Sequence, residues 1–184
     1  KKIRVIFVGD SHSISTVTAM QQALDDPESG VLSFSYSWCP TIFGVKKTGQ
    51  DDQCAGFNEW MLEQIASIPA DVPLVIVNRT SAYPFGWHQP EDKDFGRPKV
   101  YFDAPIATPT PAFQAQFKEY LAESACRIAR TRPVWVMRPI PEMMVDVPRV
   151  ASRRQQFYGD TGDISLSLAD YHRRHWLAWQ AQDE

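Results

Sequence analysis

The chain has 184 residues, of which 43% are hydrophobic and 22% charged, and its formal net charge is −3. This length suits one globular domain with a sizeable core, and the composition excludes a disordered chain. The negative charge argues against a nucleic acid partner, because phosphate binding needs clustered lysines and arginines. No apolar run approaches the roughly 18 residues of a membrane span, and the sequence opens on a predicted strand without a signal peptide. We expect one soluble domain over residues 1–184, cut from a larger protein.

Predicted strands and helices alternate along the chain. Apolar runs predict strands, and apolar residues at helical spacing predict helices. The expected strands are residues 3–8, 31–36, 74–78 and 134–137, and the expected helices are about 12–25, 57–68, 113–128 and 166–182. Residues 79–109 and 139–163 are expected to be irregular. Strands separated by helices imply a three-layer α/β/α domain with a central parallel sheet, of the flavodoxin-like kind.

In such a sheet, sites form where the strands end. Gly9 allows the backbone to turn sharply after the first strand, and Ser11 then stands at the amino end of the first helix. Free N–H groups and the helix dipole would stabilise an oxyanion there. Ser11 is therefore a candidate nucleophile. The alternative is that Asp10, Ser11 or Ser13 only caps the helix.

Polar residues also follow the later strands. Asn78 ends the third apolar strand, so its amide is expected to face the same region as a second oxyanion donor. The alternatives are a turn-forming asparagine and a glycosylation sequon at Asn78-Arg79-Thr80. Arg79, Arg138 and Glu142 stand at strand exits as well. They can bind a sugar or an acyl carbonyl, or form a buried ion pair between the two long loops.

The cysteines bear on the compartment. Cys39 and Cys54 bracket a polar loop that contains glycine. A disulfide here would close a loop of about 15 residues, worth about 3 kcal/mol, and would need an oxidising compartment. Two free thiols are the alternative. Cys126 lies on a helical pattern and is interpreted as a buried small hydrophobe or as one half of a pair.

Together these residues resemble the SGNH hydrolase-type domain of bacterial membrane-bound polysaccharide O-acyltransferases. The resemblance spans most of the chain and rests on four segments in matching order: Phe7-Val8-Gly9-Asp10-Ser11-His12-Ser13, Cys39-Pro40 with Cys54, Val77-Asn78-Arg79-Thr80-Ser81-Ala82-Tyr83, and Met137-Arg138-Pro139-Ile140-Pro141-Glu142-Met143.

The resemblance implies a periplasmic domain of an inner-membrane protein, and we expect it to need no cofactor or metal. It implies Ser11 as the nucleophile, with its own N–H and Asn78 as oxyanion donors. An acyl group, acetyl in the first instance, would be delivered by a membrane acyltransferase domain and passed to a hydroxyl of a polysaccharide or lipopolysaccharide. Two alternatives stay open: an esterase that removes such groups, and a non-catalytic domain that binds a glycan or a partner.

The base that a serine nucleophile needs is the point where the pattern breaks. The family places it in a late Asp-x-x-His motif after a fifth strand, and this sequence has no such motif. His12 adjoins Ser11 and is expected to hydrogen-bond the backbone or a nearby loop, and His88 to be a surface residue or to line the cleft. His172 and His175 are expected on a solvated helix face rather than at a metal site. We expect the C-terminal part with the base to be missing, and the 184-residue chain to be inactive alone.

Overall fold

The computed structural model describes residues 1–49, 53–89, 95–159 and 162–184. Its main sheet has four parallel strands in the order β2-β1-β4-β6. These strands are β1 (Lys2–Gly9), β2 (Ser29–Ser35), β4 (Leu74–Val77) and β6 (Val134–Val136). A small antiparallel sheet pairs β3 (Lys46–Lys47) with β5 (Val100–Tyr101). The predicted parallel α/β arrangement is confirmed.

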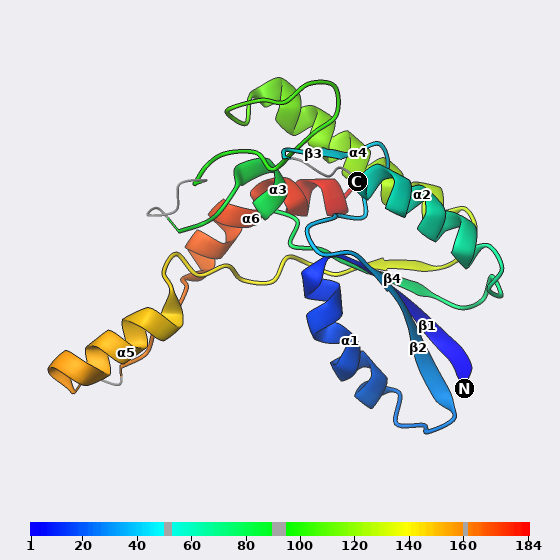
Figure 1. Cartoon of the computed structure of the whole chain (residues 1–184), viewed down its shortest axis with the longest axis horizontal. Helices are drawn as coiled ribbons and strands as arrows, with labels where there is room; N and C mark the ends of the chain where they lie inside the picture. The colour runs from blue at the N-terminus through cyan, green and yellow to red at the C-terminus, as the bar shows by residue number, and fades with distance from the viewer. Residues whose placement is uncertain (50–52, 90–94, 160–161) are drawn as a thin grey trace.

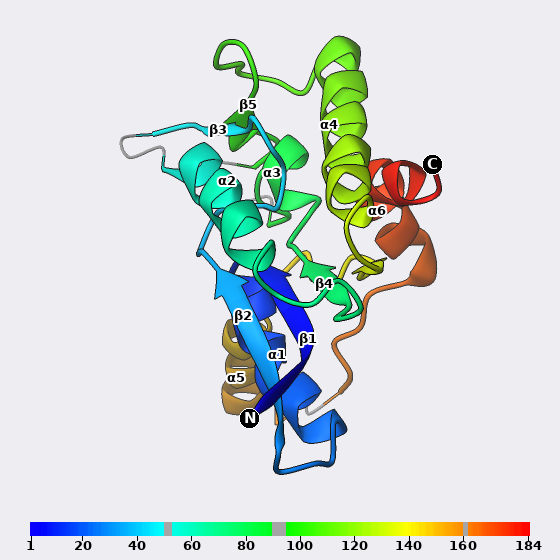
Figure 2. The same ribbon diagram turned by 90° about the vertical axis from the view of Figure 1, so that its right-hand side faces the viewer.

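The helices lie on both faces of the main sheet. They are α1 (Ser11–Ala23), α2 (Cys54–Ile65), α3 (Ala82–Phe85), α4 (Pro111–Ala129), α5 (Val147–Tyr158) and α6 (Leu168–Gln182). Helix α1 covers one face, and α2 and α4 cover the other (Figures 1 and 2). Helix α3 and helix α6 lie beyond the strand ends, above the turn into α1 (Figure 1). No helix in the described part of the chain is long and apolar enough to cross a membrane.

Strand β1 supplies both layers of the core, which explains its continuous apolar run. On one face, Ile6 and Val8 pack with β4 against α2 and α4, in a cluster that contains Met61, Ile65 and Ile128. On the opposite face, Val5 and Phe7 pack against α1 through Val17 and Met20. The alternation of side chains along one strand therefore fixes both helical layers.

A third cluster holds α3 and α6 over the carboxyl edge of the sheet. It centres on the fully buried Phe117 of α4 and includes Tyr83 of α3, Phe102 after β5, and Leu177 of α6. Helix α6 packs directly on α4. This cluster brings segments that are far apart in the sequence to the edge where β1 and β4 end.

Three expectations about the chain are corrected here. Residues 139–163 are not wholly irregular, because α5 forms between an Asp146 cap and the left-handed Gly159. Helix α5 buries no residue and projects from the body (Figure 1), and its composition is strongly polar, which is why the segment was expected to be irregular. Residues 79–109 contain α3 and β5, although residues 90–94 lie outside the described part. Cys126 is exposed on α4 rather than buried.

Candidate active site

The turn from β1 into α1 requires glycine at position 9. Gly9 has φ +146°, and a Cβ there would lie 1.9 Å from the carbonyl oxygen of Val77. The two central strands can approach so closely only because no side chain is present. Asp10 then caps α1, with its Oδ1 accepting the His12 N–H at 2.8 Å. Ser11 is the first helical residue and not the cap, which leaves its hydroxyl free of that role.

Asp10 also connects the first turn to the turn after β4. Its Oδ2 accepts the backbone N–H of Arg79 at 2.7 Å and the hydroxyl of Tyr83 at 2.6 Å. The Asp10 side chain is buried, and burial together with this carboxylate raises the pKa of Tyr83 well above its ordinary value. Tyr83 is therefore a permanent donor, and the β1–α1 and β4–α3 turns are joined through a single carboxylate.

Asn78 lies beside this turn with its amide oriented. Its Oδ1 accepts the Thr41 N–H at 3.2 Å. A Cβ atom added to Gly9 would lie 3.1 Å from the same oxygen, so the amide is next to the turn. The Nδ2 group makes no hydrogen bond to any described residue, so the donor end of the amide is available. Asn78 and Thr80 are only 6% and 4% exposed, which excludes the sequon as a glycosylation site in the folded chain.

Glu142 braces the site from the loop after β6. One of its oxygens accepts from Arg79 Nε at 3.1 Å, and the other accepts from Arg174 Nη2 at 2.6 Å. Arg174 of α6 also donates to the Gly86 carbonyl at 2.6 Å. Arg79 and Glu142 thus form the ion pair between loops that the sequence allowed. Arg174 is buried rather than solvated, because α6 turns this side toward Glu142; burial lowers its pKa, and Glu142 opposes that shift.

All four histidines of the sequence lie in described segments. His88 donates from Nδ1 to the Glu142 carbonyl at 2.8 Å, and burial lowers its pKa. Burial also lowers the pKa of His12, with Asp10 opposing the shift and Arg79 reinforcing it. Both rings are therefore mainly neutral near neutral pH.

His172 and His175 differ sharply although they share α6. His172 is exposed, as expected. His175 is 1% exposed, shares a 2.7 Å hydrogen bond with Ser81 Oγ, and its pKa is lowered by burial to about 4. The solvated-face prediction is wrong for His175, because its side of the helix packs against α3. No histidine forms a hydrogen bond to the Ser11 hydroxyl within the described structure.

The comparison with family models decides the family. The model described as "SGNH domain (fused to AT3 domains)" matches residues 1–184. The chain belongs to this SGNH family. No curated protein matches the sequence. The solved periplasmic domain of a lipopolysaccharide acetyltransferase from Salmonella ser. Paratyphi A shares the fold, with a TM-score of 0.60 at 11% identity. The match covers 98% of this chain and 62% of that one.

The predicted disulfide is present in this SGNH domain. Cys39 and Cys54 are bonded, with their Cα atoms 5.4 Å apart. Both cysteines are buried, and the bond joins the loop that carries Thr41 to the first residue of α2. The loop that orients the Asn78 amide is therefore covalently anchored.

One predicted residue lies apart from the cluster. The Arg138 guanidinium stacks over Trp179 at 4.1 Å and pairs with Asp183 Oδ1 at 2.5 Å, both at the carboxyl end of α6. The structure therefore connects Asp10, His12, Arg79 and Glu142, and it places Asn78 beside Gly9, two residues before Ser11. Arg138 lies apart from them. Among the described residues, no group of three or more His, Cys, Asp or Glu side chains is placed to hold a metal ion.

Sequence reasoning missed four groups that complete the site of this SGNH domain. They are Thr41, Tyr83, Arg174 and His175. Tyr83 lies inside a segment on which the family resemblance rests, so that segment was the available signal. His175 lies 94 residues after Ser81, and Arg174 lies 32 residues after Glu142. Neither belongs to a motif, because only folding brings them to the site.

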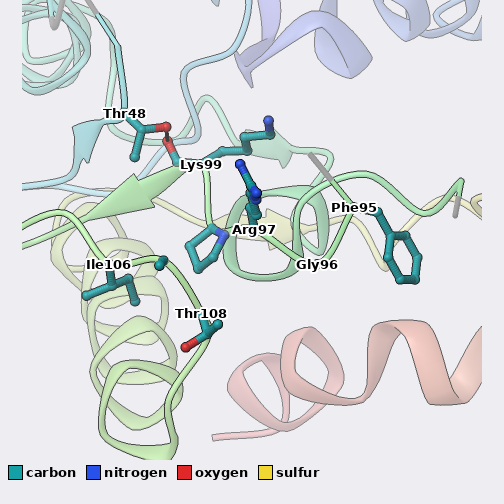
Figure 3. A pocket seen from close by; sticks show the side chains of 9 residues that line it. Thr48, Phe95, Gly96, Arg97, Lys99, Ile106 and Thr108 are labelled. Atoms are coloured by element: carbon teal, nitrogen blue, oxygen red, sulfur yellow. Dashed lines mark hydrogen bonds between the residues drawn. The ribbon is translucent and has the colours of Figure 1, made fainter. Parts of the chain in front are cut away.

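A separate hollow lies away from this cluster. Its volume is about 650 Å³, and it is lined by Thr48 after β3, by residues 95–99 before β5 and by residues 106–108 after it. Figure 3 shows Arg97 and Lys99 on one side of the hollow and Ile106 and Thr108 on another. None of the predicted site residues lines it, so it is no part of the candidate active site.

Proposed function

We propose that this SGNH domain is a serine-nucleophile O-acyltransferase domain that acts in the periplasm. It would pass a small acyl group, acetyl foremost, to a hydroxyl of a cell-surface polysaccharide or lipopolysaccharide. Two findings support an acyl-related role: the family comprises SGNH domains fused to AT3 domains, and a solved relative in fold is the periplasmic domain of a lipopolysaccharide acetyltransferase.

The observation that carries this proposal is the orientation of the Asn78 amide. The Thr41 N–H donates to the amide oxygen of Asn78 and so fixes the orientation of the amide. The NH₂ group of Asn78 can therefore donate to another acceptor beside the turn that ends at Ser11. The N–H of Ser11 is also without a backbone partner in the described residues, as the first N–H groups of a helix are. Two donors next to one serine at a helix start are what an acyl-transfer oxyanion needs.

In the proposed reaction, Ser11 Oγ attacks the acyl carbonyl of the donor and loses its proton to a base. The tetrahedral oxyanion is stabilised by Ser11 N–H and Asn78 Nδ2–H. Collapse expels the donor's oxygen or sulfur, which takes the proton back, and leaves an ester on Ser11. A sugar hydroxyl then attacks that ester, its proton passes through the base to Ser11 Oγ, and the acylated sugar leaves.

The base is proposed to come from outside these 184 residues, as the Asp-x-x-His motif does in the family pattern. His88 and His175 are hydrogen-bonded to Glu142 and Ser81, and His172 is exposed on α6. The buried Nδ1 of His12 has no hydrogen-bond partner among the described residues, so the hydrogen bond expected for this ring is not formed there. The chain alone would then show little turnover. The acyl donor would be supplied by the fused membrane acyltransferase domain.

The test is covalent labelling with a fluorophosphonate in the presence of imidazole, which replaces a missing base. We expect labelling at Ser11 that rises with imidazole and disappears in Ser11→Ala. Asn78→Ala should slow it by about a hundredfold, the effect of removing one oxyanion donor. Ser15→Ala is the matched control, since Ser15 is an exposed serine one turn along α1. Labelling that persists in Ser11→Ala would contradict the proposal.

A partition measurement separates transfer from hydrolysis, because both reactions share the acyl-enzyme. The acylated Ser11 is mixed with polysaccharide in water, and the acyl product is assigned to the sugar or to free acid. We expect the sugar to receive most of the label. Release as free acid alone would make the domain an esterase.

A further inference from the structure

We propose that Trp38 and Trp87 form an aromatic platform that binds one sugar ring of the acceptor polysaccharide next to Ser11. The inference rests on the proposed function, and it names a binding subsite of that same site. The two indoles lie in an edge-to-face arrangement, with their ring centroids 4.9 Å apart. Trp38 follows β2, and Trp87 follows α3, so the pair is assembled from two separate loops.

A series of contacts connects this platform to the candidate nucleophile. Arg79, whose backbone N–H binds Asp10 beside Ser11, places its guanidinium 4.6 Å from the centre of the Trp87 ring. Trp38 belongs to the same loop as Thr41, whose N–H orients the Asn78 amide. The Trp38 loop therefore also orients the amide of Asn78, and Trp87 is linked to the site through Arg79, so the platform lies at the margin of the site.

Trp38 holds a conformation and an exposure that packing alone does not favour. Its φ is +61°, in the left-handed region that bulky residues rarely occupy, and 39% of its surface is exposed. Such backbone strain persists where the surroundings fix it, and it clusters at ligand-binding positions. Here the Cys39–Cys54 disulfide and the hydrogen bond from Cys39 N to Tyr36 O fix the turn on either side of Trp38.

The chemistry of the platform fits a sugar ring. The C–H groups on one face of a pyranose carry partial positive charge and match the negative face of an indole. Arg79 adds polar specificity: Nε is bound to Glu142, while neither terminal nitrogen has a hydrogen-bond partner among described residues. Those N–H groups can therefore donate to sugar hydroxyls in a fixed plane. Glu142 is in turn held by Arg174, so the platform is preorganised.

The experiment is a fluorescence titration of the 184-residue chain with the water-soluble polysaccharide released from a bacterial lipopolysaccharide. We expect Trp38→Ala to weaken binding by about tenfold or more, as for an aromatic anchor, and Trp38→Phe to weaken it by only about threefold because a ring remains. Trp135→Ala is the matched control, since Trp135 is 67% exposed on β6. It should bind as the unchanged chain does.

Fluorophosphonate labelling of the same variants separates this proposal from the proposed function. Trp135→Ala should label at Ser11 at the unchanged rate, because Trp135 is exposed on β6. If Trp38→Ala loses polysaccharide binding while Ser11 of the unchanged chain is not labelled at all, the sugar subsite is supported and the acyltransferase is overturned. If Ser11 is labelled but Trp38→Ala binds the polysaccharide as tightly as the unchanged chain does, only the subsite is overturned. The same holds if Ser11 is labelled but the unchanged chain does not bind the polysaccharide. Equal losses in Trp38→Ala and Trp135→Ala would also overturn it.

Discussion

Acidification should destabilise the domain through His175. The folded pKa of His175 is about 4 against 6.5 in the unfolded chain, because the ring is buried against Ser81. Below pH 6.5 the unfolded state therefore takes up a proton that the folded state refuses, and stability falls as the pH drops toward 4. At pH 5 this difference amounts to about 2 kcal/mol.

The assay is urea unfolding at about pH 7.5 and about pH 5, where the pH-dependent loss of unfolding free energy is compared between variants. His175→Gln removes the titrating ring, so the loss between the two pH values should shrink by about 2 kcal/mol. His172→Gln is the matched control, an exposed histidine on the same helix, and should behave as the unchanged chain. If His175→Gln loses as much stability as His172→Gln on acidification, the burial argument is refuted.

Three further substitutions test the framework of the site by urea unfolding. Gly9→Ala should give no folded protein or lose about 3 kcal/mol or more, because its Cβ would collide with the β4 backbone; unchanged stability would contradict the close approach. Glu142→Gln should cost about 3 kcal/mol by leaving a buried guanidinium without its charge partner, whereas Glu59→Gln, which breaks an exposed pair, should cost less than about 1 kcal/mol; equal costs would count against the buried brace. The double variant of Cys39 and Cys54 to alanine should lose about 3 kcal/mol, and a midpoint that does not move would show that the loop is held without the bond.

Much of the fold was predictable because its signals are local. Apolar runs predict β1 and β4, and the helical spacing of apolar residues predicts α4. The alternation of strands and helices along the chain then implies a parallel sheet. Helix α5 escaped prediction because it is polar overall and buries nothing, so its segment resembles an irregular loop in composition. The capping residues Asp146 and Gly159 were the signals in the sequence that indicate a helix.

The residues of the candidate site were likewise predictable only where their signal is local. Asp10, Ser11 and Asn78 could be named because each stands where an apolar strand stops. The burial of Arg174 and His175 could not be inferred, because both side chains are polar and their partners, Glu142 and Ser81, are distant along the chain. A long-range contact decides their charge and exposure, and no local pattern encodes it.

Position 10 tolerates one side chain. The oxygens of Asp10 face three donors: the N–H of His12, the N–H of Arg79 and the hydroxyl of Tyr83. Asparagine has the same shape, yet in either orientation its NH₂ group would point at a backbone N–H that cannot accept. Glutamate carries an extra methylene into a buried space. We therefore expect aspartate to be retained at position 10 in variants of this domain, even if their substrate changes.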